Sequence, residues 1–600
     1  MKPLVALTFA TVLYAAPSGE AVFRQHCATC HDSGNARVPS RDALQRLSVT
    51  NILRTLEFGA MANIASPLKR EDRDAVAAFL GTPAVAITPP PGALCSDRTV
   101  RLPAATSTST WNGWSPAAAN TRFQPAAAAG LSLDQVGRLK LKWAFGFDGD
   151  IVAFAQPAVL DHELFVGSAA GIVRALDAQT GCMKWQYQAT GPVRSAMLVV
   201  PLVNNKHAVL FGDQTGLFYS LEAETGKLLW RKRPEAHESV RLTGAPVAYQ
   251  GVVYVPVSSW EEPRTLNPAY ACCTYRGSLV AYRISDGSQV WKTYTIPEKP
   301  KMTGKNTAGV EQWGPSGASI WSAPTIDPKR GVIYVTTGDN FSAPASSMSD
   351  SVLALEIKTG KIVWAKQTTP GDIWISSCSG NCPGPDFDFG SSALLEKLDD
   401  KRDVLLAGQK SGVVYALDPD RKGEILWQVR VGKGGINGGV QWGMASDGQR
   451  VYAATSDVVR GPSNPNKLDP NPLPLDNKEG GGLTAIRISN GQQAWHTAPP
   501  ACSAKPGCSP AQAAAVTAIP GVVFSGSLDG HLRAYTSEDG RIIWDFDTVR
   551  TFQTVNGVPA SGGALNGPGP VIVGGMLFVN SGYARAGGLP GNVLLAFAPE

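Results

Sequence analysis

The 600-residue sequence has little charge imbalance and, after its first residues, no long apolar run. The formal net charge of +5 is small for this length and gives no indication of a nucleic-acid ligand. Because no second apolar stretch follows the N-terminal one, no transmembrane helix is expected. Glycine (63 residues) and proline (44 residues) are abundant instead, which is typical of a turn-rich β protein.

The first residues have the pattern of a secretory signal peptide. Lys2 precedes the apolar run Leu4–Ala16. A membrane anchor is the alternative, but the run is short for a membrane-spanning helix. We therefore expect residues 1–17 to be a signal peptide and the mature chain to reach the periplasm, where cysteines tend to pair.

A short unit recurs along most of the chain, and Gly171–Trp185 (GIVRALDAQTGCMKW) is one copy of it. A small residue opens a short apolar strand, a glycine-containing turn follows, and a second strand ends in tryptophan. The alternation of Val173 and Ala175 has the period of a β-strand, and Thr-Gly, Asp-Gly and Asn-Gly pairs suit tight hairpins. Six further complete copies are Gly216–Trp230, Gly277–Trp291, Ser351–Trp364, Gly412–Trp427, Gly482–Trp495 and Gly530–Trp544.

Two half copies lie at opposite ends of the repeat region. Leu139–Trp143 has only the tryptophan end, and Gly591–Pro599 has only the opening strand. Joined in space, the halves complete an eighth copy and close the sheets into a ring without free edges. The pattern predicts an eight-bladed β-propeller, in which one tryptophan per blade packs between neighbouring blades. These tryptophans are Trp143, Trp185, Trp230, Trp291, Trp364, Trp427, Trp495 and Trp544.

The sequence Cys27-Ala-Thr-Cys30-His31 is the attachment signature of a c-type haem. The two thiols add to the haem vinyl groups, and His31 supplies one axial nitrogen to the iron. A redox-active cysteine pair or half of a zinc site is the alternative. For the sixth ligand Met61 fits well, whereas His26 stands too near the attachment site. A His/Met pair raises the reduction potential and suits an electron acceptor.

The haem signature and the repeats predict the domain order. After residues 1–17, a small all-α cytochrome c domain is expected at 18–82, with a closing amphipathic helix at Leu68–Leu80. Residues 83–134 begin with a proline-rich connector and are expected to link to and cover the propeller. The propeller itself is expected at 135–600.

With a haem signature ahead of eight tryptophan-ended repeats, the chain resembles the quinohaemoprotein alcohol dehydrogenases, which use pyrroloquinoline quinone (PQQ). The resemblance covers nearly the whole mature chain. Within this family, the chain resembles in particular the branch that acts on polyvinyl alcohol. Its most specific stretches are Ser258–Tyr275, Thr336–Phe341 (TTGDNF), Pro383–Ser392 (PGPDFDFGSS) and Asn556–Phe597.

This resemblance implies residues for a PQQ site. Trp321 would form the floor beneath the quinone, which suits the stacking of flat rings. Cys272 and Cys273 would form a vicinal disulfide on a quinone face. In the family the pair follows an earlier blade, near the place of Arg194–Leu198 here, so it reaches the quinone from another direction or not at all. The further implied PQQ contacts are Thr243, Ser259, Lys410 and Asn437.

The resemblance also implies a metal ion and a catalytic base. Glu262, Asn340 and Asp386 match the family's metal ligands, and such oxygen donors suit Ca²⁺. Asp388 matches an additional acidic ligand of the lanthanide-using branch, so a trivalent ion is the alternative. Asp386 would take the proton of the substrate hydroxyl while hydride passes to PQQ, and Asp372 is the alternative base.

Six cysteines outside these motifs leave room for disulfides. Cys378 with Cys382, and Cys502 with Cys508, would each close a short loop. Cys95 and Cys182 would then tie the linker to the first blade, although the sequence does not determine these pairings.

The family resemblance implies a periplasmic dehydrogenase that oxidises secondary hydroxyls of polyvinyl alcohol to ketones. Electrons would pass from PQQ to haem c and then to an external cytochrome c or another acceptor. A small alcohol, sugar or polyol is the alternative substrate. A propeller scaffold that binds proteins is the alternative class, but it would lack the haem signature and the acidic site.

Overall fold

The computed structural model describes residues 18–34, 38–58, 61–65, 67–83, 88–102, 109–378, 381–459, 475–502, 508–584 and 587–600. The chain divides into two compact units, Met1–Ile87 and Thr88–Glu600. The expected signal peptide, residues 1–17, lies outside the described residues. None of the helices described has the length and apolarity to span a bilayer.

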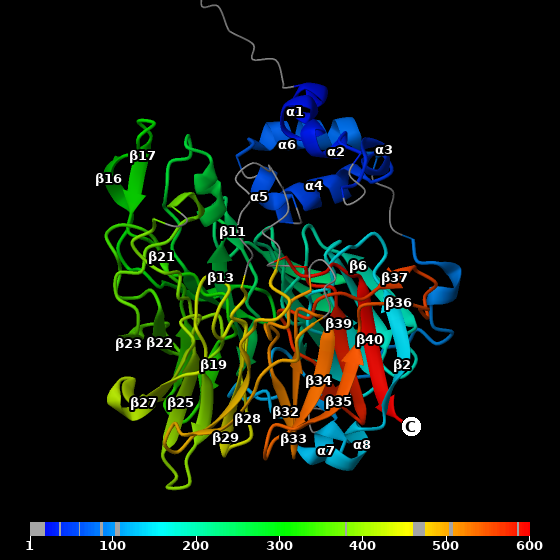
Figure 1. Cartoon of the computed structure of the whole chain (residues 1–600), viewed down its shortest axis with the longest axis vertical. Coiled ribbons are helices and arrows are strands. Elements are labelled where there is room, and N and C mark those ends of the chain that lie inside the picture. Colours follow the sequence, from blue (N-terminus) through cyan, green and yellow to red (C-terminus); the bar gives the residue numbers. More distant parts are fainter. Residues whose placement is uncertain are drawn as a thin grey trace, which may run out of the picture. The chain divides into compact units, whose positions relative to one another are not determined.

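The N-terminal unit is helical, as predicted (Figure 1). Its helices are α1 (Gly19–His26), α2 (Ala28–His31), α3 (Arg41–Leu44), α4 (Val49–Phe58), α5 (Ala62–Ala65) and α6 (Arg70–Leu80). A Cβ atom at Gly19 would lie 2.1 Å from the Ala75 carbonyl oxygen, so the glycine allows α1 and α6 to approach closely. Phe23 and Phe79 pack beside this contact with their ring centroids 6.2 Å apart.

The second unit is a β-propeller of eight antiparallel sheets, which confirms the predicted fold (Figure 1). Blade 1 contains β3 (Ala158–Leu160), β4 (Glu163–Val166), β5 (Ile172–Asp177) and β6 (Met183–Gln188), with β1 (Thr110–Trp111) beside β3. Blade 2 contains β7 (Leu198–Pro201), β8 (His207–Gly212), β9 (Phe218–Glu222) and β10 (Leu228–Lys232). Blade 3 contains β12 (Val247–Tyr249), β13 (Val252–Ser259), β14 (Ser278–Arg283) and β15 (Gln289–Tyr294), with β11 (Val240–Arg241) on β13. Blade 4 contains β19 (Thr325–Asp327), β20 (Val332–Thr336), β22 (Ser351–Glu356) and β23 (Ile362–Gln367).

The remaining blades follow the same order. Blade 5 contains β24 (Leu394–Lys397), β25 (Asp403–Gly408), β26 (Val413–Asp418) and β27 (Glu424–Arg430). Blade 6 contains β28 (Ala445–Ser446), β29 (Arg450–Thr455), β30 (Gly482–Arg487) and β31 (Gln493–Thr497). Blade 7 contains β32 (Thr517–Ile519), β33 (Val522–Gly526), β34 (His531–Thr536) and β35 (Ile542–Asp547). Blade 8 contains β38 (Val571–Val573), β39 (Met576–Ser581), β40 (Val593–Pro599) and β2 (Leu139–Gly146).

Blade 8 closes the ring with strands from both ends of the repeat region. Strand β2 pairs antiparallel with β40, in a register that places Leu139 opposite Pro599 and Gly146 opposite Val593. Figure 1 shows the red β40 beside the cyan β2. The two half repeats therefore form one sheet, as the sequence predicted.

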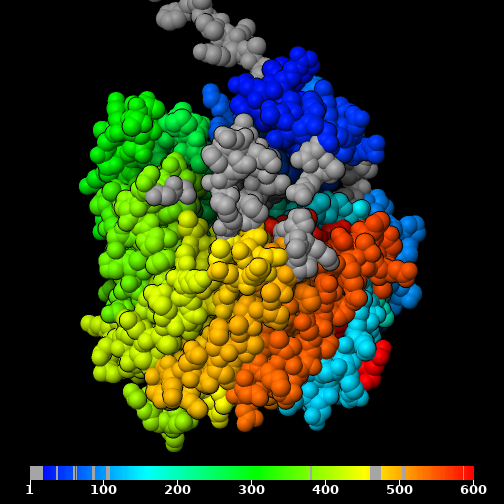
Figure 2. All heavy atoms as spheres, in the orientation of Figure 1, coloured from blue at the N-terminus to red at the C-terminus, as the bar shows by residue number. Residues whose placement is uncertain are grey.

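The repeated tryptophans join neighbouring blades. Seven indole N–H groups each donate a hydrogen bond to a backbone carbonyl of the next blade, as Trp427 does to Ile488 at 3.0 Å. The indole of Trp427 lies against Gly491, whose φ of +75° and lack of a side chain make the contact possible. Figure 2 shows the resulting close packing, with the yellow and orange blades directly against each other.

Residues 109–124 cross the propeller axis before the first blade begins. The side chains of Asn120, Arg122 and Gln124 are buried and reach inner strands of several blades. Arg122 donates to Val516 and Trp114 carbonyls and to Gln156 and Thr517 side chains, and lies over the Trp114 ring. Blades 4, 5 and 6 also bond the segment's backbone. Part of the predicted cover therefore fills one end of the axis.

Short strand pairs also lie in the connections between blades and between the strands of a blade. They include β16 (Lys301–Lys305) with β17 (Glu311–Gly314), β18 (Ser316–Gly317) with β21 (Asn340–Ser342), and β36 (Thr551–Phe552) with β37 (Ala560–Ser561). Short helices are η1 (Pro91–Ala93), α7 (Ala126–Ala129), α8 (Leu133–Val136), η2 (Glu262–Leu266), η3 (Ser376–Cys378) and η4 (Pro419–Arg421). Disulfides join Cys95 to Cys182, Cys378 to Cys382, and Cys502 to Cys508, in the pairing expected from the sequence.

Candidate active site

Three buried carboxylates from separate parts of the chain meet in the propeller. Asp339 lies between β20 and β21, and Asp386 and Asp388 lie between η3 and β24. One carboxylate oxygen from each lies within 4.8 Å of the others. The Asp339 N–H donates to Asp388 Oδ1 at 2.7 Å, which fixes the two segments together. Such a group of buried oxygen donors is suited to a hard cation.

Lys410 supplies the positive charge of this site. It lies in the turn between β25 and β26, and its Nζ is 2.7 Å from Asp386 Oδ1 and 3.0 Å from Asp388 Oδ2. The three side chains are almost completely buried, so their charges interact with little screening by water. One lysine and three carboxylates leave an excess of acidic groups, which a bound cation would balance.

The pKa values follow from burial and from this charge arrangement. Burial raises the pKa of Asp339 well above its usual range, and Asp388 and Glu262 raise it further. Burial likewise raises the pKa of Asp386, against the opposing effect of Lys410. For Asp388, burial is outweighed by Lys410 and by the Asp339 N–H, and its pKa is lowered. Without a cation, Asp388 thus ionises at a lower pH than Asp386 and Asp339.

Asp372 holds the backbone that carries Asp386. Its carboxylate accepts the N–H groups of Asp386 at 3.1 Å and Phe387 at 2.8 Å. Asp386 itself has a φ of +61°, a conformation that a non-glycine residue adopts only with support from its surroundings. Asp372 thus positions the loop that carries Asp386. Asp386, in turn, contacts Lys410 directly.

Two adjacent glutamates of the η2 region have different surroundings. Glu261 is completely buried and accepts hydrogen bonds from the Tyr270 hydroxyl and from the Thr274 and Tyr275 N–H groups. Glu262 lies close enough to Asp339 and Asp386 to raise the pKa of both. Glu262 is therefore the one of these two glutamates that lies near Asp339 and Asp386.

Asn340 is held within its own loop. Its Nδ2 donates to Ser349 Oγ at 2.6 Å and to the Asp372 carbonyl at 2.9 Å, and its Oδ1 accepts the Ser346 N–H at 2.9 Å. The preceding residue, Asp339, contributes the carboxylate of this loop to the acidic group. The sequence analysis did not select Asp339, although it is the aspartate of the same TTGDNF motif.

Trp321 lies beside the charged group. Its ring centroid is 5.7 Å from Lys410 Nζ, and its side chain is partly exposed. Trp442 meets it edge-on, with ring centroids 5.4 Å apart, and Arg194 lies 4.6 Å above the Trp442 ring. A Cβ atom at Gly390 would lie 1.9 Å from Trp321, so the ring is held tightly on that side. Trp442 and Arg194 are aromatic and cationic neighbours that the sequence analysis did not assign to the site.

The other expected PQQ contacts lie on segments around this centre. Thr243 Oγ1 is 2.8 Å from Ser258 Oγ, and the adjacent Gly244 packs on the Trp321 backbone. The turn containing Asn437 lies against the Lys410 backbone, since the Gly435 N–H donates to the Lys410 carbonyl at 3.1 Å. Ser259 lies farther along β13, where its Oγ accepts the Glu261 N–H at 3.0 Å.

Cys272 and Cys273 form a vicinal disulfide in an apolar cluster. They are only 3% and 0% exposed, and Ile375 and Phe341 pack in the same cluster. Their backbone pairs with Trp313 at the end of β17. These backbone bonds therefore join the segment of the disulfide to the β16–β17 hairpin, and the disulfide is buried whereas Trp321 is partly exposed.

The haem signature begins at Cys27, between α1 and α2, and continues through α2 of the helical unit. Cys27 and Cys30 are not joined in a disulfide, and burial raises the pKa of the Cys27 thiol. His31 Nδ1 is 2.7 Å from the Pro39 carbonyl oxygen, which orients the ring and leaves Nε2 for iron. Met61 packs on the same apolar cluster as Cys27. This donor set fits a c-type haem with His31 and Met61 as axial ligands.

A propeller with an axial lysine–carboxylate group next to a tryptophan, in one chain with a CxxCH helical unit, has the architecture of a propeller dehydrogenase with a built-in cytochrome. The sequence profile described as "Glucose/ethanol/alcohol dehydrogenase, beta-propeller domain" matches residues 111–438. The profile of the cbb3-type cytochrome c oxidase subunit III matches residues 15–80, and that of the outer membrane protein assembly factor BamB matches residues 410–589. The chain belongs to the PQQ-dependent alcohol dehydrogenase family. It is an oxidoreductase that uses PQQ and haem c.

Similar proteins extend over almost the whole chain. A polyvinylalcohol dehydrogenase of Pseudomonas sp. is 40% identical, over 97% of this chain and 94% of that protein. A polyvinylalcohol dehydrogenase of Sphingopyxis sp. (strain 113P3) is 36% identical, over 97% and 93%. Among solved structures, quinohemoprotein alcohol dehydrogenase ADHIIG of Pseudomonas putida HK5 has a TM-score of 0.61 and 20% identity, covering 84% of this chain and 83% of that chain. This structural likeness concerns the fold.

Proposed function

We propose that this enzyme oxidises secondary hydroxyl groups of polyvinyl alcohol to ketones. The observation that carries the proposal is the buried Lys410–Asp386 pair beside Trp321, in a chain that is 40% and 36% identical to two polyvinylalcohol dehydrogenases. The Lys410–Asp386 pair beside Trp321 supports an alcohol-oxidising centre. The sequence identity to the two dehydrogenases supports the substrate class.

Asp386 acts as the base. Its carboxylate takes the hydroxyl proton of the substrate, while the carbinol hydrogen leaves with its electron pair and a C=O bond forms. PQQ, when bound, accepts that hydride. Asp372 keeps the Asp386 backbone in place. Lys410 places its positive charge next to the carboxylate of Asp386.

The chain's residues provide a surface for PQQ and donors for a cation. Trp321 offers the flat face on which the quinone stacks, Lys410 lies within reach of its carbonyls, and Thr243 and Asn437 lie on neighbouring segments. Asp339, Asp386, Asp388 and Glu262 would hold the cation. Ca²⁺ is the ion usual for the family, and the four carboxylates also suit a trivalent lanthanide.

The helical unit receives the electrons. Cys27 and Cys30 would hold the haem, and His31 and Met61 would ligate its iron. When bound, the haem would supply one-electron transfer to an external cytochrome c or another acceptor. This route operates in the periplasm, and residues 1–17 act as the signal peptide.

The test follows the haem spectrum in anaerobic, haem-loaded protein. We expect polyvinyl alcohol to reduce the haem only when PQQ and a cation are both present, and Asp386→Ala to abolish the reduction. Reduction by small secondary alcohols but not by the polymer would assign the site to a different substrate. No reduction by any alcohol in fully loaded protein would refute the dehydrogenase mechanism.

A further inference from the structure

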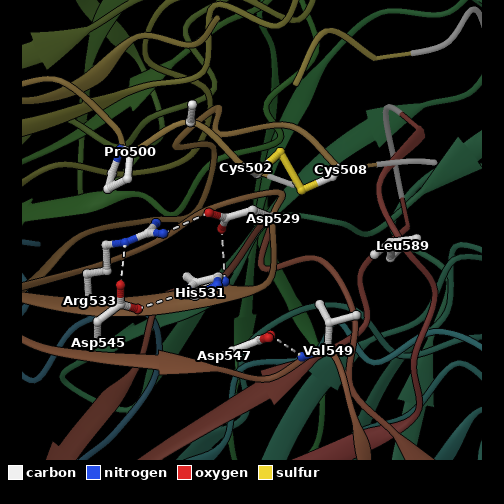
Figure 3. Close-up of a pocket in the computed structure, with 11 residues that line it drawn as sticks. Pro500, Cys502, Cys508, Asp529, His531, Arg533, Asp545, Asp547, Val549 and Leu589 are labelled. Carbon is white, nitrogen blue, oxygen red and sulfur yellow. Dashed lines mark hydrogen bonds and ion pairs between the residues drawn. A yellow bond between two sulfur atoms is a disulfide. The ribbon is translucent and has the colours of Figure 1, made fainter. Parts of the chain in front are cut away.

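A second polar cavity lies on blade 7, apart from the acidic group (Figure 3). Its volume is about 300 Å³. His531 lies at the start of β34, Asp547 ends β35, and Val549 follows it. Leu589 and the Cys502–Cys508 disulfide form other parts of the wall. The cavity thus combines charged and apolar surfaces.

Most of the charge in the cavity is paired internally. Arg533 donates to Asp529 at 2.8 Å and to Asp545 at 3.1 Å, and is buried by these contacts. His531 Nδ1 is 2.6 Å from Asp545 Oδ1, which fixes the imidazole ring. Arg533 and its two aspartates therefore form a frame that holds His531 in one orientation, as the dashed lines in Figure 3 show.

Two polar groups remain for a ligand once this frame is complete. They are His531 Nε2 and one carboxylate oxygen of Asp547, whose Oδ1 accepts the Val549 N–H at 2.8 Å. An imidazole nitrogen and a carboxylate oxygen accept or donate hydrogen bonds to hydroxyl groups. Val549 and Leu589 offer apolar contacts beside them. This combination matches an aliphatic chain that carries hydroxyls.

A metal ion is a poorer match for the cavity. Among the described residues, the group of acidic or histidine side chains that brings three ligating atoms together is the Asp339 group on the axis. In the blade 7 cavity Arg533 occupies the space between two of the aspartates. A guanidinium at this position disfavours a second cation.

The topology places the cavity on the same end of the propeller as the active site. Lys410 lies in the turn between the second and third strands of blade 5, and Asp529 lies in the equivalent turn of blade 7. A long substrate that enters the axis from this end passes over the loops of these blades. The cavity is therefore within the reach of a polymer and beyond that of a short alcohol.

We propose that the blade 7 cavity is an accessory subsite that binds hydroxyl groups of the polymer away from the one being oxidised. The inference rests on the proposed function for its substrate class. His531 and Asp547 form the hydrogen bonds, and Val549 and Leu589 contact the methylene groups between hydroxyls. The subsite increases affinity for long chains without taking part in the chemistry.

The test compares a long polymer with 2,4-pentanediol, which is too short to reach both places. In the loaded enzyme, we expect His531→Ala/Asp547→Ala to raise KM for polyvinyl alcohol at least fivefold, with kcat and the pentanediol kinetics unchanged. Val549→Trp, which fills the cavity without removing charge, should have the same effect. Asp286→Ala, an exposed aspartate in a turn of blade 3, is the control and should change neither substrate.

Calorimetric titration of PQQ-free protein with polyvinyl alcohol separates this inference from the proposed function. Binding by the wild type that weakens at least fivefold in both cavity variants supports the subsite, whether or not the polymer is oxidised. Equal binding by the wild type and the variants, or no binding by the wild type, would overturn it. Circular dichroism of each variant verifies that the propeller is folded.

Discussion

Lys410 Nζ lies 2.7 Å from Asp386 Oδ1, and both side chains are buried. Burial would lower the pKa of Lys410, but Asp386 and Asp388 outweigh it and raise that pKa above its ordinary value. The raised pKa keeps Lys410 protonated near neutral pH, so it donates hydrogen bonds and is a poor proton acceptor. Of the two side chains, Asp386 is therefore the one that we propose as the base.

Replacing Asp386 by Asn tests that assignment. The amide keeps the size of the side chain but cannot take a proton, so kcat should fall by about 10²- to 10⁴-fold. PQQ titration by absorbance should show that the quinone still binds. Asp372→Asn is the matched comparison, because it disturbs the backbone of Asp386 and leaves its carboxylate, and we expect a smaller loss. A variant D386N with wild-type kcat would exclude Asp386 as the base.

Cation binding should release protons. Burial raises the pKa of Asp339 and Asp386, so in the cation-free protein both carboxyl groups keep their protons to a higher pH than ordinary aspartates do. A cation requires the carboxylate forms, and its affinity should therefore increase as the pH rises. Calcium titration by calorimetry in buffers of different ionisation enthalpy measures the protons released. Binding without proton release, at an affinity independent of pH, would contradict these protonation states.

Removing the charge of Lys410 should destabilise the cation-free protein. Lys410→Met leaves the ionised Asp388 buried without its partner, which costs about 3–5 kcal/mol for a pair of this kind. Added Ca²⁺ should restore part of that loss, because it replaces the missing positive charge. Thermal unfolding with and without Ca²⁺ measures both effects, and Lys410→Arg is the charge-preserving control. Equal stability of Lys410→Met and the wild type would show that the ion pair contributes little.

The contact between turn glycine and tryptophan can be tested with a matched pair of glycines. Gly491 and Gly251 have φ values of +75° and +77°, so alanine costs about 1 kcal/mol of backbone strain at either position. A Cβ atom at Gly491 would lie 2.8 Å from the Trp427 ring, whereas nothing lies within 4 Å of one at Gly251. Gly491→Ala should therefore be less stable than Gly251→Ala by about 1–3 kcal/mol in denaturant unfolding. Equal losses would mean that the tryptophan contact is loose.

Met61→Ala tests the sixth iron ligand. The haem should remain attached, because Cys27 and Cys30 are intact, but loss of the thioether should lower the reduction potential. Redox titration followed by the haem spectrum measures the change, and His26→Ala is the control. An unchanged potential in Met61→Ala would assign the ligand elsewhere.

The sequence predicted the features that depend on local repetition. The tryptophan-ended units predicted the blades, and the two half units predicted ring closure. Both predictions rest on the strand period and the turn residues, which are patterns of neighbouring residues in the sequence. The arrangement of the acidic site depends on contacts between blades. Asp339 and Asn340 are adjacent and both polar, and the sequence does not show that the Asn340 amide bonds Asp372 and Ser349 while Asp339 contacts Asp388.

The burial of the vicinal disulfide also escaped prediction. Two adjacent cysteines in a sequence indicate a bond, but not which surface covers it. Here the cover is Ile375 from a distant insertion and the backbone of Trp313. The position of residues 109–124 across the propeller axis was also not predictable from the sequence, because this segment is held by hydrogen bonds to inner strands hundreds of residues away.

Residues 109–124 fill space at one end of the propeller axis. Arg122 and Trp111 of this segment are completely buried, and Arg122 bonds Gln156 of blade 1 and Thr517 of blade 7. For the polymer substrate that we propose, entry and exit would then take place at the opposite end of the axis. Each binding event would bring a bend or a free end of the polymer, and so only a short run of hydroxyls, to Asp386. Oxidation along the polymer would proceed by repeated binding and release and not by sliding.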